Sequence, residues 1–330
     1  MEPAASRTYL LTGAAGFIGA RVAEVLLGQG HCVVGLDNLN DAYDRRLKDW
    51  RLLRLLEQPG FAFRKVDIAD RAALRQAWDD ERYEAVINLA ARAGVRQSVR
   101  DPWSYYASNV VGTLNLLELC REQGVGKFVQ ASTSSLYGAH NPRPFREEAD
   151  VSRPLSPYAA SKGAAELLCH SYHSLYGLDV TVLRYFTVFG PAGRPDMSIF
   201  RFVQWIAEER PVIVYGDGNQ ERDFTFVDDI AHGTAAGLRP LGYEVINLGG
   251  DHPVPLHAVI KRLEALLGKR ARVERCPESP ADIRATWADV SKAGRLLGWE
   301  PTTPLDVGLR ACIEWYLAER SWAQDVSTVD

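Results

Sequence analysis

The chain has 330 residues, of which 46% are hydrophobic and 24% charged, and its formal net charge at pH 7 is −4. A chain of this length exceeds what one hydrophobic core usually sustains, so we expect about two domains. The slight excess of acidic residues gives no basic surface for a phosphate backbone, which argues against a nucleic-acid partner.

The cysteines and the hydropathy pattern indicate a reducing compartment. No Cys-x-x-Cys pair is present, which favours reduced thiols over disulfides or a zinc site. The first seven residues lack the basic and apolar regions of an export signal, and no apolar run is long enough to cross a membrane. We therefore expect a cytoplasmic protein without a membrane partner.

The first part of the chain alternates short apolar runs with helical patterns. An apolar run at residues 9–11 precedes a glycine-rich turn, a helical segment at 20–28 and a second apolar run at 32–36. Further apolar runs lie at 61–66, 85–90, 127–131, 180–185 and 245–248, and the clearest helical patterns lie at 109–123 and 158–176. Strands that alternate with helices predict a doubly wound α/β domain with a parallel, Rossmann-type sheet.

From residue 187 onward, glycine and proline interrupt shorter segments. Helical patterns at 199–209, 256–267 and 307–318 predict a smaller α/β cap domain. Residues 228–238 and 245–248 resemble one more helix and strand of the large sheet. We therefore assign residues 1–186 and 226–250 to a cofactor-binding domain and residues 187–225 and 251–330 to a discontinuous cap.

The glycine-rich turn has the spacing of a dinucleotide-binding loop. Gly13, Gly16 and Gly19 follow a predicted strand and open a predicted helix, where missing side chains let the backbone approach a pyrophosphate. Asp37 ends the second predicted strand, 18 residues after Gly19, where a carboxylate can accept hydrogen bonds from an adenosine ribose. Either feature alone suits an ordinary turn, but together they favour NAD, since a 2′-phosphate would meet like charge.

Residues after the third and fourth predicted strands fit the same groove. Asp67 could meet the adenine edge, and Leu89, Ala90 and Ala91 are small enough to let a nicotinamide lie close. Each of these positions taken alone also suits ordinary packing.

Tyr158 and Lys162 lie four residues apart, so on a helix their side chains share one face. A tyrosine with a pKa of about 10 is a poor base at neutral pH, and a neighbouring ammonium stabilises its phenolate. The pair follows a predicted strand and a hydroxyl cluster at residues 132–135, at the edge where open α/β sheets bind ligands. This position favours a catalytic pair over a surface pair.

Together these motifs resemble the extended short-chain dehydrogenase/reductase family, of the NAD-dependent epimerase/dehydratase type, over essentially the whole chain. The motifs are TGAAGFIG at 12–19, LAA at 89–91, YG at 137–138, SPYAASK at 156–162 and RDF at 222–224. Within that family the chain is most similar to the UDP-glucuronate 4-epimerases. This likeness depends on DNLND at 37–41 with YD at 43–44 and LK at 47–48, RYFTVFGP at 184–191 and GRPDM at 193–197.

The resemblance implies roles for individual residues. Tyr158 would be the base, Lys162 would bind the cofactor ribose and tune Tyr158, and Thr133 would hydrogen-bond the reacting sugar hydroxyl, with Ser134 and Ser135 beside it. Besides the residues already named, the implied cofactor contacts are Phe17, Ile18, Asn38, Ile68, Asn109 and Tyr185.

Three positions distinguish this chain from related enzymes. Ser134 and Ser135 stand where the 4,6-dehydratases carry Asp and Glu and where the decarboxylases carry a glutamate at the second position, and serines cannot readily do that acid/base work. Arg194 has little reason to approach the neutral hydroxymethyl group of UDP-glucose, whereas a guanidinium matches a carboxylate in a bidentate pair. Without its flanking motif, Arg194 would be interpreted as a loop residue in solvent.

The resemblance also implies a UDP-binding set. Arg222 would bind the diphosphate and Asp282 the uridine ribose, while Arg96 and Thr187 would contact the substrate. Related epimerases often have a second phosphate arginine before that aspartate, but this chain has Glu-Ser-Pro-Ala at 278–281. Whether Arg284 replaces it stays open.

The expected function is NAD-dependent interconversion of UDP-glucuronate and UDP-galacturonate through a 4-keto intermediate, in a homodimer built from the helices at 109–123 and 158–176. The alternatives are a UDP-hexose 4-epimerase and a cofactor-binding sensor without catalysis. No metal is expected, because His170 and His173 share a helical face but lack convergent partners.

Overall fold

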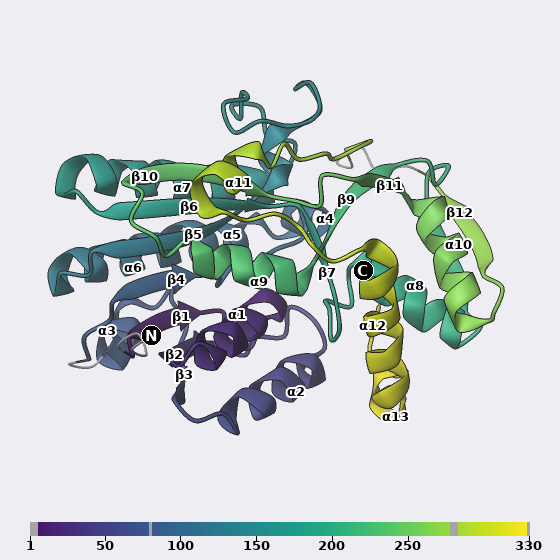
Figure 1. Ribbon diagram of the computed structural model, residues 1–330, viewed down its shortest axis with the longest axis horizontal. Helices are drawn as coiled ribbons and strands as arrows, with labels where there is room; N and C mark the ends of the chain where they lie inside the picture. The colour runs from purple at the N-terminus through teal and green to yellow at the C-terminus, as the bar shows by residue number, and fades with distance from the viewer. Residues whose placement is uncertain (1–5, 79–80, 278–282, 329–330) are drawn as a thin grey trace.

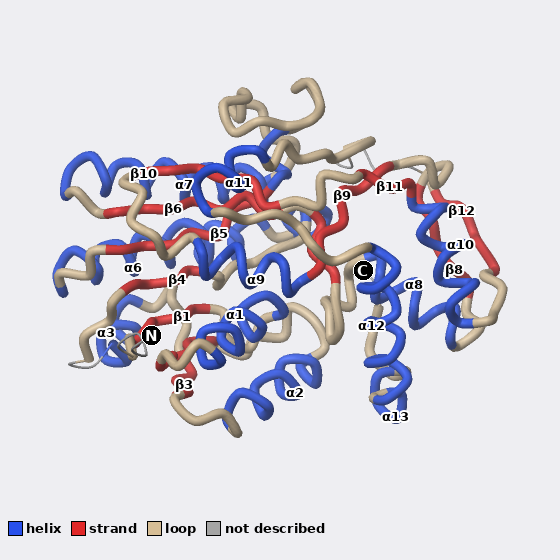
Figure 2. The backbone as a smooth tube through the Cα atoms, viewed as in Figure 1, coloured by secondary structure: helices blue, strands red, loops and turns tan. Residues whose placement is uncertain are grey.

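The computed structural model describes residues 6–78, 81–277 and 283–328. Its largest sheet has seven strands, all parallel, in the order β10-β6-β5-β4-β1-β2-β3, and Figures 1 and 2 show it on the side of the molecule that holds the N-terminus. The strands are β1 (Thr8–Thr12), β2 (Cys32–Asp37), β3 (Phe61–Lys65), β4 (Ala85–Asn88), β5 (Lys127–Thr133), β6 (Asp179–Tyr185) and β10 (Tyr243–Leu248). The sequence order reverses between β1 and β4, and ligands of such sheets bind at this point, outside the carboxyl ends of the strands.

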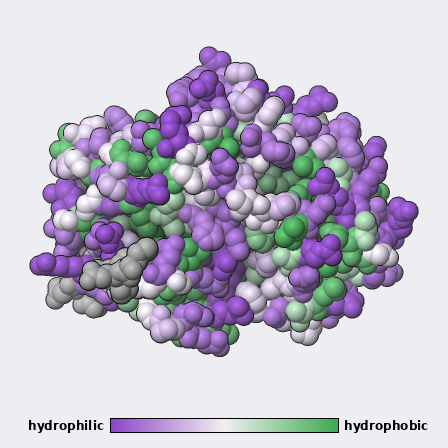
Figure 3. Space-filling view, viewed as in Figure 1, coloured by the Kyte–Doolittle hydropathy of each residue, from purple (hydrophilic) through white to green (hydrophobic). Residues whose placement is uncertain are grey.

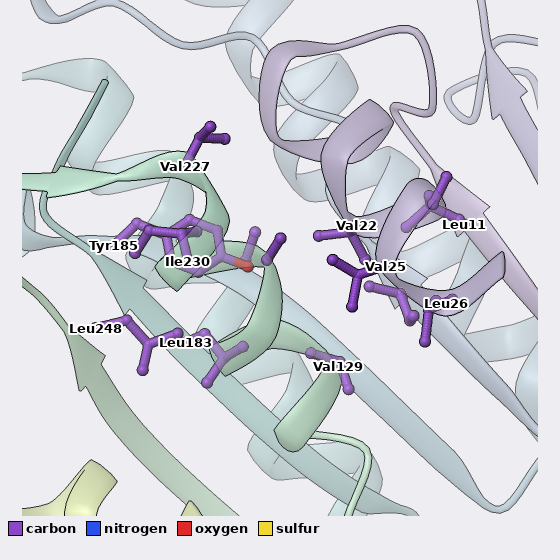
Figure 4. Packing of buried hydrophobic residues seen from close by; sticks show 14 of the residues in the cluster. Leu11, Val22, Val25, Leu26, Val129, Leu183, Tyr185, Val227, Ile230 and Leu248 are labelled. Atoms are coloured by element: carbon purple, nitrogen blue, oxygen red, sulfur yellow. The ribbon is translucent and has the colours of Figure 1, made fainter. Parts of the chain in front are cut away.

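Helices cover both faces of this sheet, as the doubly wound pattern predicts. One face packs against α1 (Phe17–Gly28), α9 (Val227–Ala236) and α11 (Ser291–Leu297). Figure 4 shows the apolar side chains of α1 and α9 meeting those of the strands, with Val22, Ile230 and Leu183 among them. The other face packs against α3 (Arg71–Trp78), α6 (Gly112–Gln123) and α7 (Pro157–Tyr176).

The remaining part of the chain forms a second apolar core beside the carboxyl edge of the large sheet (Figure 1). It combines a three-stranded sheet, in the order β11-β9-β7, with a two-stranded sheet of β8 and β12. The strands are β7 (Thr187–Phe189), β8 (Pro211–Tyr215), β9 (Glu221–Phe226), β11 (Pro253–Pro255) and β12 (Arg272–Cys276). The helices are α8 (Ser198–Ala207), α10 (Leu256–Leu267), α12 (Leu305–Ala318) and α13 (Arg320–Ala323).

Helix α2 (Arg45–Leu56) joins the two parts of the molecule. It follows β2 in the chain, yet Leu47 packs in a small cluster with Ala192, Phe200 and Val326 from the second part. The shorter elements that follow β4 are α4 (Val95–Arg100), α5 (Pro102–Tyr106) and a π-helical turn at Ala107–Val111, and a 3₁₀ turn at Ser134–Tyr137 follows β5.

The predicted fold class is confirmed, and the predicted strands of the large sheet match the observed ones within two residues at each end. The predicted helix at 109–123 differs at its start, because the chain makes a π turn before α6 begins at Gly112. The division into two domains stays a prediction. Ala293, Leu297 and Trp299, which we assigned to the cap, pack in the core of α1 and α9, so α11 belongs with the large sheet by packing.

The surface seen in Figure 3 intersperses hydrophilic residues with small hydrophobic patches. Within the described ranges, no helix is both long enough and apolar enough to span a lipid bilayer.

Candidate active site

The glycine-rich turn joins β1 to α1 at the carboxyl edge of the large sheet. Gly13 has a φ of +71°, and a Cβ there would lie within 2.9 Å of backbone atoms of Leu89 and Ala90. A Cβ at Gly19 would overlap the carbonyl oxygen of Gly13. The close contact of the turn with the end of β4 therefore requires glycine at position 13, and the close contact of α1 with the turn requires glycine at position 19.

The N-terminus of α1 is suited to an anion. Gly16 precedes the helix without a capping side chain, and the first turn holds no acidic residue. Gly16, Phe17, Ile18 and Gly19 all line a cleft at this edge. The first N–H groups of the helix, together with its dipole, can therefore bind a pyrophosphate.

The residues expected to contact the cofactor gather around this cleft, with one exception. Those that line it are Gly13, Gly16, Phe17, Ile18, Gly19, Asp37, Asn38, Asp67, Ile68, Leu89, Ala90, Ala91, Tyr158, Lys162 and Tyr185. The cleft is long, and it combines an uncapped helix end, a carboxylate and small apolar residues. These features fit NAD.

Asp37 is held at the end of β2 by the glycine turn itself. Its carboxylate accepts hydrogen bonds from the N–H groups of Ala15, at 3.2 Å, and Leu39, at 2.8 Å. The ammonium of Lys48 lies 3.4 Å from the same carboxylate and also donates to Asn40. The sequence argument against a 2′-phosphate depended on the negative charge of the Asp37 carboxylate alone. The structure shows that the buried ammonium of Lys48 lies beside this carboxylate.

Asn109, the exception, does not line the cleft. Its side chain accepts from the N–H of Arg92 at 2.9 Å and donates to the carbonyl of the same residue at 3.0 Å. It also donates to the hydroxyl of Ser161 in α7. Asn109 therefore holds the segment after β4 against α7, the helix that carries Tyr158. Asn109 takes this position because it lies in the π turn.

Tyr158 and Thr133 meet where α7 begins and β5 ends. Ser156 caps α7 by accepting from the N–H of Ala159, and Pro157 occupies the first turn, so Tyr158 and Lys162 lie on one face of the helix. Burial raises the pKa of Tyr158, while a hydrogen bond with Thr133 and the positive charge of Arg194 lower it. The net direction is upward.

Lys162 is buried below Tyr158, with 3% of its surface exposed. Burial lowers the pKa of its ammonium to about 8, against the attraction of the Glu166 carboxylate. The expected stabilisation of the Tyr158 phenolate by Lys162 stays a prediction, and the charge of Arg194 also lowers the pKa of Tyr158.

A second cleft opens between the end of β5 and the strands of the smaller part. The predicted residues that line it are Ser134, Ser135, Arg96, Thr187 and Arg222. The guanidinium of Arg96 in α4 lies 3.8 Å from the centre of the Tyr215 ring, so α4 meets the end of β8 across this cleft. Asp282 lies outside the described residues, and the side chain of Arg284 is exposed.

Arg194 lies where the two clefts meet, since it lines the first and its neighbour Asp196 lines the second. Its Nε and one Nη donate to the two oxygens of Asp196, at 3.0 and 2.5 Å, and the same Nη donates to the carbonyl of Ala93 at 2.9 Å. The bidentate partner expected from the substrate is therefore Asp196 of the chain itself. The other Nη is the group that Arg194 can still offer to a ligand.

Sequence reasoning gave no function to Arg51, Asp196 or Tyr215. Arg51 lies in a charged helix whose pattern shows no apolar face, and Asp196 is only two residues from its partner. No local signal distinguishes either residue from a surface charge. The family motif contained Tyr43 and Lys48, but only the structure places both in the first cleft. Among the described residues, no cluster of histidine, cysteine and carboxylate side chains could hold a metal ion.

Comparisons with known proteins show the family to which the chain belongs. The model of the NAD-dependent epimerase/dehydratase family matches residues 9–249. A UDP-glucuronate 4-epimerase of Thermodesulfobacterium geofontis is 56% identical over 308 residues, which cover 93% of this chain and 95% of the relative. The Bacillus cereus UDP-glucuronic acid 4-epimerase, solved in complex with UDP-glucuronic acid and NAD, is 37% identical with a TM-score of 0.88, over 94% of this chain and 99% of that one.

A UDP-glucose 4-epimerase of Thermotoga maritima, solved with UDP-glucose, is 30% identical with a TM-score of 0.86, over 95% of this chain and 99% of that one. The parallel sheet, glycine turn and tyrosine–lysine helix thus define a dinucleotide-dependent enzyme class that acts on nucleotide sugars in these relatives. The chain belongs to the NAD-dependent epimerase/dehydratase family.

Proposed function

We propose that this chain is an NAD-dependent 4-epimerase that interconverts UDP-glucuronate and UDP-galacturonate without loss of carbon dioxide. The observation that carries the proposal is the position of Arg194, beside Tyr158 at the junction of the two clefts. Asp196 occupies one edge of this guanidinium, and the remaining Nη can donate to a sugar carboxylate on the carbon next to C4. The 56% identity to a UDP-glucuronate 4-epimerase supports the same substrate.

The proposed chemistry assigns one task to each residue. Tyr158 removes the proton of the C4 hydroxyl, and Thr133, hydrogen-bonded to Tyr158, orients that hydroxyl. When bound, NAD⁺ accepts the hydride from C4 and returns it to the other face of the 4-keto sugar. Ser134 and Ser135 orient the sugar but offer no carboxylate for elimination.

A time course of proton NMR spectra with the purified chain and UDP-glucuronate tests this function. We expect UDP-galacturonate to accumulate to a constant ratio, with no pentose product. Faster turnover of UDP-glucose would favour the UDP-hexose alternative, and no turnover of either sugar would favour a cofactor-binding sensor.

The cofactor is proposed to stay bound between turnovers, because each cycle returns the hydride that it removes. The purified protein should release NAD when it is denatured, in an amount close to one per chain. Absence of dinucleotide together with no stimulation by added NAD⁺ would contradict this, as would a preference for NADP.

A homodimer is proposed through α6 and α7 with the elements beside them. Large apolar side chains are exposed along this side of the molecule, which supports an interface. They are Trp103, Tyr106, Val111, Leu114, Leu167, Leu175 and Tyr176.

We propose the division into a cofactor domain and a discontinuous cap, with α11 moved to the cofactor domain. The two separate apolar cores support it, and Phe226 and Val227 lie in different cores at the proposed boundary.

We also propose a cytoplasmic location, supported by five free cysteines, of which Cys120, Cys169 and Cys312 are buried.

A further inference from the structure

Arg51, in α2, contacts three separate segments of the chain with one guanidinium. Its Nε and Nη2 donate to the carbonyl oxygen of Ala192, at 3.1 and 2.5 Å, and Nη2 also donates to that of Gly193 at 3.3 Å. Its Nη1 donates to the carbonyl oxygen of Ala15 at 3.2 Å and to the hydroxyl of Tyr43 at 2.8 Å. The side chain is buried, so these bonds are shielded from water.

The loop that contains Ala192 and Gly193, which Arg51 contacts on one side, has an unfavourable backbone conformation. Ala192 has a φ of +49°, in the left-handed region that residues with a Cβ rarely adopt. A Cβ at Gly190 would lie 2.5 Å from the Val227 side chain, so the loop also runs close against the start of α9. Such a conformation persists only where the surroundings fix it, and Arg51 donates three hydrogen bonds to the loop that help to do so.

The same guanidinium joins this loop to the cofactor cleft. Arg194 follows Ala192 by two residues and lies beside Tyr158. On the other side, Ala15 belongs to the glycine turn, and its N–H donates to the Asp37 carboxylate. A single buried side chain therefore connects the turn that would hold the pyrophosphate with the loop that presents Arg194.

We propose that Arg51 is a positioning residue that couples the cofactor cleft to the orientation of Arg194, so that NAD and a UDP-sugar with a carboxylate strengthen each other's binding. The proposal rests on the function proposed above. Lysine cannot replace the guanidinium, because one ammonium cannot reach acceptors on three segments in a planar fork.

The test measures how fast NAD leaves the purified holoprotein, with an excess of an NAD-specific dehydrogenase as the trap. The Tyr158→Phe background prevents turnover. Saturating UDP-glucuronate is expected to slow the release of NAD at least fivefold more than saturating UDP-glucose, which has a neutral hydroxymethyl group in place of the carboxylate. Arg51→Lys should reduce this difference to less than twofold, while Arg54→Lys, an exposed position on the same helix, should leave it unchanged.

A second variant covers the case in which Arg51→Lys does not fold or loses NAD. Tyr43→Phe removes one acceptor of Arg51 and should reduce the difference to about two- to threefold. The inference is overturned if Arg51→Lys folds, keeps NAD and still shows the fivefold difference. Where Arg51→Lys does not fold or loses NAD, the inference is overturned if Tyr43→Phe keeps that difference. It is also overturned if the background protein shows no difference while the wild-type chain epimerises UDP-glucuronate. Lack of any wild-type turnover would instead contradict the proposed function.

Discussion

Burial acts in opposite directions on the two ionisable groups proposed for catalysis. It raises the pKa of the Tyr158 phenol and lowers that of the Lys162 ammonium to about 8, and both shifts favour the neutral form. Tyr158 can therefore act as a base only with positive charge nearby. The charge of Arg194 lowers the pKa of Tyr158, so the arginine proposed to select the substrate would also tune the base.

Replacing Tyr158 with phenylalanine should reduce kcat by about 100-fold or more, because only the proton-accepting oxygen is lost. The amount of NAD in the purified protein and its thermal unfolding should stay close to those of the wild type. Steady-state rates with UDP-glucuronate check this, and a rate within severalfold of the wild type would remove Tyr158 as the base.

The pKa of Lys162 predicts the alkaline limit of activity. The ammonium is charged below a pH of about 8 and loses its proton as the pH rises through that value. If its charge supports the phenolate, kcat/KM should fall above pH 8 by up to about tenfold per pH unit. Lys162→Arg should move this fall to higher pH, since arginine stays protonated. A profile that is flat to about pH 10 would contradict the role.

Arg194→Ala tests how decarboxylation is avoided. Oxidation at C4 creates a ketone β to the carboxylate, and carbon dioxide leaves readily once the breaking bond aligns with the carbonyl π system. We expect the variant to epimerise more slowly and to form a larger share of 4-keto-pentose or pentose, as measured by mass spectrometry. Arg153→Ala, at an exposed loop position, is the control. If Arg194→Ala epimerises at the wild-type rate and forms no decarboxylated product, Arg194 has no role beyond that of an ordinary loop residue.

At the scale of elements, the contact between the glycine turn and α1 determines whether the cofactor cleft forms. Gly19→Ala would place a Cβ on the carbonyl oxygen of Gly13, and backbone on both sides must move. We expect a loss of at least about 2 kcal/mol in the free energy of unfolding and little bound NAD. Gly28→Ala, in the same helix with open space around it, should be neutral or slightly stabilising. Chemical denaturation measures both, and equal stability of the two variants would contradict the argument.

The elements that sequence could predict are those whose signal is local. Alternating apolar runs located the strands of the large sheet, and the spacing of glycines located the cofactor turn. Helix α2 was missed because charged residues interrupt its pattern, and one of them, Arg51, is buried against partners far along the chain. Asn109 was expected to contact the cofactor, but it lies outside the cleft, and its contact with Arg92 depends on a π turn that residue types do not reveal.

At the scale of the whole molecule, the exposed apolar side chains predict a dimer. Light scattering at micromolar concentration should give twice the mass of one chain, because burying these side chains removes apolar surface from water. Leu167→Glu in α7 should shift the protein to monomer, while Leu317→Glu, an exposed position in α12, should not. A wild-type monomer would refute the proposed interface.

The two apolar cores are interleaved along the chain. Val188 and Phe189 are neighbours in sequence but lie in different cores, and so do Phe226 and Val227, while α11 returns to the first core before α12 joins the second. A single recombination event therefore cannot exchange the substrate-binding part of one such gene for that of another. Relatives that accept different sugars should have diverged by replacing residues in the loops between the cores, and directed evolution of specificity should follow the same route.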